Sequence, residues 1–303
     1  MGHSHGNKGA DGAALSRAFA LGVGLNVVFV LVEAIFGVVA HSTALLADAA
    51  HNASDVLGLG LAWGASALAR RRPSLRHTYG LRASTVLAAL ANAVLLLVAV
   101  GGVSWEAIRR LANPGPVEGA TVLAVAALGV VINATSALLF LRGRKNDANV
   151  RAAFLHLAAD AGVSLGVVVA GALIWRTGWS WVDPAVSLVV SIVVLVATWG
   201  LLREALHLAL DGVPEGVDVV AVQTYLRSLP DVSAVHDLHI WAMGTTETAL
   251  TAHLVLPWCP EPPAFLSYLE RELHERFGID HATVQLEPTG DTTACRLAPE
   301  DVV

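Results

Sequence analysis

The chain has 303 residues, of which 55% are hydrophobic and only 15% are charged. Soluble domains usually contain about 25% charged residues, so this composition predicts a membrane protein. The formal net charge is −6, and no basic run or aromatic-basic stripe indicates binding to nucleic acid. The two cysteines, Cys259 and Cys295, are far apart and indicate neither a disulfide framework nor a cysteine-based zinc site.

Residues 1–16 are expected to form a flexible polar tail that lacks the basic region and cleavage site of a secretory signal. A membrane domain is expected at 17–211, and its six apolar segments of spanning length cover residues 18–40, 44–69, 84–107, 117–141, 152–175 and 182–203. Arginine and lysine are in excess in the loops after the second and fourth segments. Because positive loops stay inside, we expect a multi-pass protein of the inner or plasma membrane with both termini in the cytoplasm.

The composition changes after Asp211, where the charge density becomes that of an ordinary soluble domain. Alternating apolar residues and proline positions predict a helix at 216–229, strands at 232–242 and 247–256, a helix at 263–277 and a strand at 280–287. This order predicts an α+β domain at 212–290, with a small sheet covered on one face by two helices, and a tail at 291–303. Its core is small, so dimerisation through this domain is physically sensible.

Two of the apolar segments contain a histidine followed four residues later by an aspartate. His51 and Asp55 lie in the second segment, and His156 and Asp160 lie in the fifth. Residues four apart share one face of a helix, and a central Asp disfavours membrane insertion by about 2.5–3.5 kcal/mol. Two imidazoles and two carboxylates suit tetrahedral zinc. The repeated spacing therefore favours a metal site over a structural polar network.

For several other polar residues, the sequence leaves two interpretations open. Asp48 either assists the histidine three residues later or serves the start of its helix. For Glu33, an interhelical hydrogen bond is favoured over a role as a proton relay. In the soluble part, His236, His253 and Glu287 come from three predicted strands. They either bind a regulatory zinc ion or are ordinary surface or interface residues without metal.

The segment from Leu45 to His51, followed by Asp55, resembles the second-span motif of the cation diffusion facilitators, which are zinc-exporting transporters. Further similarities extend over about residues 17–288, and they include Thr78-Tyr79-Gly80, the segments 149–156 and 235–241, Asp183-Pro184, and the segment 281–287. The resemblance implies a homodimer of six-helix membrane domains with ferredoxin-like, metallochaperone-like cytoplasmic domains. One departure is Gln285, which stands where some relatives have a metal-binding histidine.

The resemblance also implies a transported ion, because members with His and Asp on both spans prefer zinc. We therefore expect a secondary active transporter, not an enzyme, that carries Zn²⁺ out of the cytoplasm by alternating access in exchange for protons. Cadmium and cobalt ions fit the same ligand geometry. The alternative is a membrane sensor or receptor that binds zinc without net transport. An intramembrane metalloprotease is disfavoured because the chain has no H-E-x-x-H motif.

Overall fold

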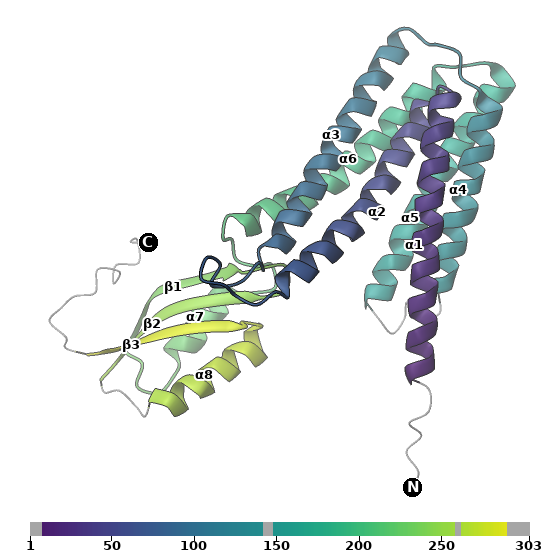
Figure 1. Ribbon diagram of the computed structural model, residues 1–303. Helices are drawn as coiled ribbons and strands as arrows, with labels where there is room; N and C mark the ends of the chain where they lie inside the picture. The colour runs from purple at the N-terminus through teal and green to yellow at the C-terminus, as the bar shows by residue number, and fades with distance from the viewer. Residues whose placement is uncertain (1–7, 142–147, 258–261, 290–303) are drawn as a thin grey trace. The chain divides into compact units, whose positions relative to one another are not determined.

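The structure is a computed structural model that describes residues 8–141, 148–257 and 262–289. Within these residues, six long helices precede an α-β-β-α-β domain (Figure 1). The helices are α1 (Lys8–Val39), α2 (Thr43–Ala69), α3 (Ser84–Ala112), α4 (Gly119–Phe140), α5 (Ala148–Thr177), α6 (Val182–Ala209), α7 (Val219–Arg227) and α8 (Pro262–Phe277). The strands are β1 (Ala234–Ala242), β2 (Thr248–Leu256) and β3 (His281–Pro288). The predicted order of elements is confirmed.

The long helices have the composition of membrane-spanning segments. Among the described residues, α3, α4, α5 and α6 are long and apolar enough to cross a membrane, and Gly24–Val39 of α1 is a shorter apolar helix. Helix α2 does not meet this standard, because His51, Asn52 and two aspartates interrupt its apolar sequence. The helical membrane domain is confirmed, and the count of six spans stays a prediction for α1 and α2.

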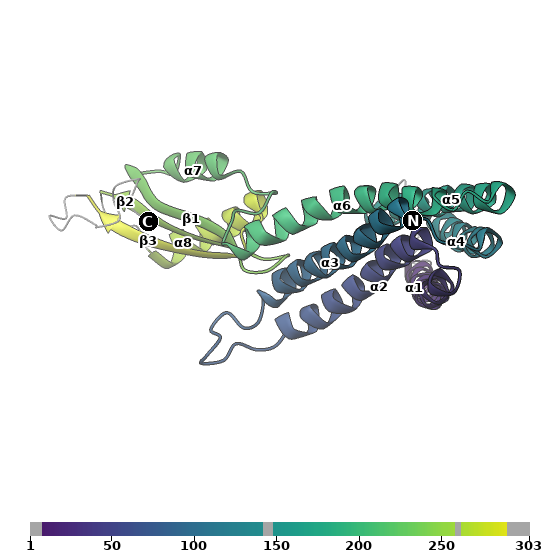
Figure 2. The same ribbon diagram turned by 90° about the horizontal axis from the view of Figure 1, so that it is seen from above.

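The chain forms two compact units, one with the residues up to 60 and 92–200, the other with 61–91 and the residues after 200. In the first unit, α4 and α5 lie side by side (Figures 1 and 2). Their backbones touch where Gly119 faces Gly171, and a Cβ atom on Gly171 would lie only 2.6 Å from the backbone nitrogen of Leu123. Small residues permit this close approach of helices within membranes.

A buried carboxylate at the start of α6 fixes the start of α2. Asp183 accepts hydrogen bonds from the backbone N–H of Thr43 at 2.6 Å and from that of Ala44 at 3.4 Å. It also accepts one from the Thr43 hydroxyl at 2.8 Å and one from the Ser42 hydroxyl. A carboxylate is favourable here because the first N–H groups of a helix lack partners and carry partial positive charge. Helix α2 is thereby held by α6 about two turns before His51.

The second unit contains a three-stranded sheet in the order β1-β2-β3, with β1 antiparallel and β3 parallel to β2. Alternate residues of β2 from Leu250 to Leu256 are buried and face one side of the sheet. They share a hydrophobic core with Leu226 of α7 and Leu273 of α8. Both helices therefore cover the same face, as predicted, and the opposite face presents His253.

Candidate metal centre

The structure brings the two His-Asp pairs of α2 and α5 together in the first unit. His51 Nε2 lies 3.3 Å from Asp160 Oδ1 on the other helix and 3.8 Å from Asp55 Oδ2 on its own helix. His156 Nε2 lies 3.3 Å from Asp55 Oδ2 on the other helix and 3.6 Å from Asp160 Oδ2 on its own. Each histidine thus contacts both aspartates. We call these four residues the membrane ligand set.

These separations suit a metal ion with short bonds. Zinc binds nitrogen and oxygen at about 2.0–2.2 Å, which places neighbouring ligand atoms of a tetrahedron about 3.3–3.6 Å apart. The four nitrogen–oxygen distances are 3.3–3.8 Å. In addition, His51, Asp55 and Asp160 offer ligand atoms that all lie within 4.8 Å of one another. His156 is outside this group of three, and its ring centroid lies 6.2 Å from that of His51, so a tetrahedral site requires the two imidazoles to move closer together.

The membrane ligand set lies at the wall of a cavity of about 400 Å³. The Asp160 side chain is only 6% exposed, whereas that of His156 is 50% exposed. Besides three of the ligands, polar residues from four helices line this cavity, namely Asn26, Asn52, Asn92 and Ser136. Uncharged amide and hydroxyl groups can bind the water around an ion without holding the ion itself. Three of the four residues of the set therefore share one cavity with neutral polar side chains from four helices.

Glu33 and Asp48 are both fully buried beside this set. Asn52 Nδ2 donates to Glu33 Oε2 at 3.2 Å, so the predicted interhelical hydrogen bond of Glu33 is confirmed. Asp48 accepts a hydrogen bond from Ser164 Oγ of α5 at 2.8 Å. Asp48 lies in the second turn of α2 and joins this helix to α5. Neither of the two interpretations of Asp48 from the sequence included this contact with α5.

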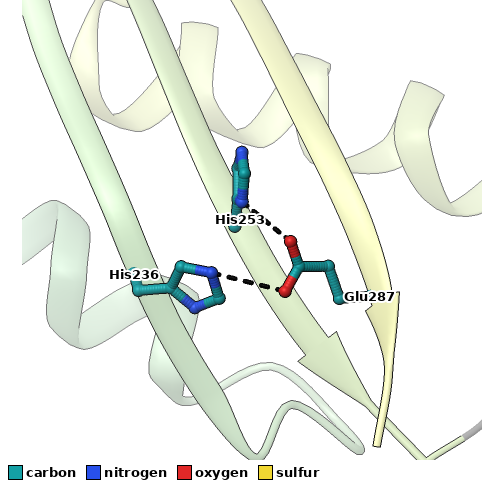
Figure 3. A group of neighbouring side chains, drawn as sticks. All are labelled: His236, His253 and Glu287. Carbon is teal, nitrogen blue, oxygen red and sulfur yellow. Dashed lines mark ion pairs between the residues drawn. The ribbon is translucent and has the colours of Figure 1, made fainter. Parts of the chain in front are cut away.

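A second cluster of metal-binding side chains lies on the helix-free face of the sheet (Figure 3). His236 from β1, His253 from β2 and Glu287 from β3 point toward one another, and their ligand atoms lie within 4.8 Å. Glu287 reaches both histidines, with Oε1 at 2.8 Å from His253 Nδ1 and Oε2 at 3.3 Å from His236 Nε2. We call these three residues the sheet cluster. The expected convergence occurs, and metal binding by the cluster stays a prediction.

Asp237 adjoins this cluster, and the sequence analysis did not identify it as a candidate ligand. Its Oδ2 lies 3.4 Å from His253 Nε2, and its Oδ1 lies 2.8 Å from His239 Nε2. Regular alternation would place residues 236 and 237 on opposite faces. The register of β1 shifts between His236 and His239, and Asp237 has a φ of 51°. Such a bulge redirects side chains. In the sequence, the only signal that Asp237 could join the cluster is its position between His236 and His239.

The two parts of the chain, the helical membrane domain and the small α+β domain, each match a family model. The family model described as the cation efflux transmembrane domain matches residues 20–208, and that of the cation efflux protein cytoplasmic domain matches residues 214–289. The chain therefore belongs to the cation efflux family. It is a multi-pass membrane transporter and not a catalytic enzyme.

Relatives match the chain along nearly its whole length. The metal cation efflux system protein CzcD of Cupriavidus metallidurans is 35% identical over 287 residues, which are 94% of this chain and 90% of the relative. The zinc transporter ZitB of Escherichia coli is 36% identical over 293 residues, 95% of this chain and 93% of the relative. The cadmium, cobalt and zinc/H(+)-K(+) antiporter of Bacillus subtilis is 34% identical over 292 residues, 95% of this chain and 92% of the relative.

Among solved structures, the metal-bound C-terminal domain of the CzcD transporter of Cupriavidus metallidurans is 36% identical to this chain. The match covers 23% of this chain and 99% of the solved domain, with a TM-score of 0.22.

Proposed function

We propose that the protein carries Zn²⁺ out of the cytoplasm in exchange for protons, with the membrane ligand set as the site that holds the ion in transit. The observation that carries this proposal is the crossed contact of each histidine with the aspartates of both helices, at separations of 3.3–3.8 Å. The names of the ZitB and Bacillus subtilis relatives support zinc as the cargo and protons as the exchanged ion. Cadmium and cobalt suit the same ligands.

Exchange follows from the acid–base chemistry of the ligands. Imidazole and carboxylate bind zinc only when they are deprotonated, so zinc and protons compete for the same atoms. Structural zinc sites reach about 10–16 kcal/mol of binding free energy, and a carrier of that strength without a release step would keep its cargo. Protonation of the ligands supplies the release. We further propose alternating access, in which the ligand set faces each side of the membrane in turn.

We propose a cytoplasmic location for both termini, because the arginine-rich loops after α2 and α4 stay inside. The domain boundaries expected from the sequence, at 17–211 and 212–290, are retained as part of this proposal. The match to the family's cytoplasmic domain supports placing residues 214–289 in the cytoplasm. We also propose a homodimer that forms through this domain, whose single small sheet has limited core of its own.

For the sheet cluster, we propose that His236, His253 and Glu287 bind a regulatory zinc ion. The carboxylate of Glu287 contacts both imidazoles, at 2.8 Å and 3.3 Å. A bound ion would join all three strands of the sheet and stabilise the domain.

The test is zinc flux into proteoliposomes that contain the purified full-length protein, with and without a pH gradient. We expect a pH gradient to drive zinc accumulation by the wild-type protein. Asp160→Ala should abolish flux and lower the zinc bound per chain, because it removes a membrane ligand with only 6% exposure, whereas zinc bound by the sheet cluster should remain. His41→Ala, which changes an exposed histidine outside the set, should leave both unchanged. Flux that survives Asp160→Ala, or that ignores the gradient, would refute the proposal. Binding without accumulation would identify the sensor alternative.

A further inference from the structure

A second buried polar group lies one helical turn from the membrane ligand set. Its members are Glu33 from α1, Asp48 and Asn52 from α2, and Ser164 from α5, and none is more than 5% exposed. Asp48 precedes His51 by three residues, and Ser164 follows Asp160 by four. We call these four residues the buried network. None of them belongs to the ligands that the proposed exchange uses.

The buried network contains two carboxylates but no cationic side chain. Ser164 Oγ donates to Asp48 Oδ2 at 2.8 Å, and Asn52 Nδ2 reaches Glu33 Oε2 at 3.2 Å and Asp48 Oδ1 at 3.5 Å. Both donors are neutral. Among the described residues, the fully enclosed Glu33 Oε1 has no hydrogen-bond partner. A buried carboxylate oxygen without a donor is costly, so this atom points to a cation that the side chains do not supply.

The charged neighbours do not remove this need. Besides Asp48, the titratable groups of α2 are His51 and Asp55, and α5 has His156 and Asp160 in its interior. Asp183 lies at the start of α6, whereas the remaining titratable groups of α5 and α6 lie near the helix ends, namely Arg151, Arg176, Arg203, Glu204 and His207. The two histidines face the aspartates of the ligand set, and Asp183 is engaged by the start of α2. Helix α4 has no titratable residue between Gly119 and Phe140. One amide donor, Asn52 Nδ2, lies within hydrogen-bond distance of both carboxylates, and two negative charges on one neutral donor repel each other in a buried setting.

Glu33, Asp48 and Ser164 of the network are not part of the cavity wall, whereas Asn52 lines the cavity and connects it to the two carboxylates. With the proposed orientation, α2 runs inward and α5 runs outward, so Asp48 and Ser164 lie on the outer side of the ligand set. The cavity is lined by Gly58 and Leu59, which follow Asp55 toward the inner end of α2. It is also lined by Ala153, which precedes the α5 ligands. The ligands are therefore open toward the cytoplasm and closed toward the outside by the buried network.

We propose that Glu33 and Asp48 form a proton-binding site, separate from the membrane ligand set, through which protons from outside reach the ligands. The pair holds one proton between its two carboxylates, passes it inward when zinc leaves, and takes another from outside. No bond other than those to the proton changes. This inference rests on the proposed zinc/proton exchange, and it adds the site at which incoming protons are first bound.

The test compares two fluxes of the full-length protein in proteoliposomes. One is zinc accumulation driven by a pH gradient whose acidic side is the vesicle interior, where the zinc accumulates in exchange for protons that leave. The other is exchange of radioactive for unlabelled zinc at equal pH, which moves zinc both ways and requires no net proton movement. We expect Glu33→Gln to keep zinc affinity and zinc/zinc exchange, while its proton-driven flux falls to the rate seen without a gradient. Asp48→Asn should behave likewise, and Glu33→Asp should restore part of the driven flux.

Ser191→Ala is the matched control, because this hydroxyl is buried in α6 and has no hydrogen-bond partner among the described residues. It should leave both fluxes unchanged. If the two fluxes fall in parallel in both Glu33→Gln and Asp48→Asn, the pair has a structural role and the inference is overturned. Unchanged driven flux in both variants overturns it as well. Failure of the proposed function is distinguishable, because zinc flux would then survive Asp160→Ala, or ignore the pH gradient in the wild-type protein, whatever the Glu33 variants do.

Discussion

The contact between α4 and α5 predicts that one glycine of α5 tolerates no side chain while another does. Gly171 faces α4, where an added Cβ would lie 2.6 Å from the backbone nitrogen of Leu123 and 2.9 Å from its Cα. Gly162 lies on the same helix, and an added Cβ there would meet nothing within 4 Å. Gly171→Ala and Gly162→Ala therefore make the same chemical change in the same helix but in opposite environments.

The expected difference in stability follows from these distances. Ordinary contacts of a Cβ begin at 3.4 Å, so the new methyl group at position 171 is about 0.8 Å too close to an atom of the backbone. Backbone cannot rotate away, and the two helices must separate locally. Overpacking of this kind costs about 1–3 kcal/mol. Replacing a helical glycine by alanine gains about 0.5–1 kcal/mol at either position, so this gain cancels between the variants.

We therefore expect Gly171→Ala to unfold with a free energy about 1–3 kcal/mol lower than that of Gly162→Ala. The measurement is reversible unfolding in mixed micelles, followed by helical circular dichroism as the denaturing detergent increases. Gly162→Ala should be at least as stable as the wild-type protein. Equal unfolding free energies for the two variants would show that α4 and α5 do not approach each other at Gly171.

Two further changes test the start of α2 and the sheet cluster. Asp183→Ala should lower the unfolding free energy by about 2–6 kcal/mol, because the backbone N–H groups of Thr43 and Ala44 lose their acceptor. In the same assay, Ser187→Ala removes a single hydrogen bond to the Thr43 carbonyl and should lower the unfolding free energy by about 0.5–1.5 kcal/mol. Equal losses of unfolding free energy in Asp183→Ala and Ser187→Ala would contradict the role given to Asp183. His253→Ala should lower the zinc bound per full-length chain after dialysis, and unchanged metal content would argue against a zinc site in the sheet cluster.

Local patterns in the sequence predicted the elements and most candidate ligands. Membrane-length apolar segments and period-two alternation gave most helix and strand ends within a few residues of those observed. The larger differences are that α1 begins at Lys8 instead of near residue 18, and that α3 and α6 end at Ala112 and Ala209 instead of near residues 107 and 203. The residues before 18 include several alanines, which favour the helix. The four-residue spacing of His51 and Asp55 placed both on one face of α2. These features depend on residues close in sequence, and for that reason they are readable without a structure.

Contacts between elements required the tertiary structure. The position of His51 within 3.3 Å of Asp160 depends on the register of α2 against α5, which no local pattern encodes. The parallel pairing of β2 with β3 and the bulge that turns Asp237 toward His253 are equally non-local. Glu33 appeared in the sequence as a single acid in an apolar helix. Packing of three helices made it part of a network with too few donors, because burial decides whether a carboxylate needs a partner.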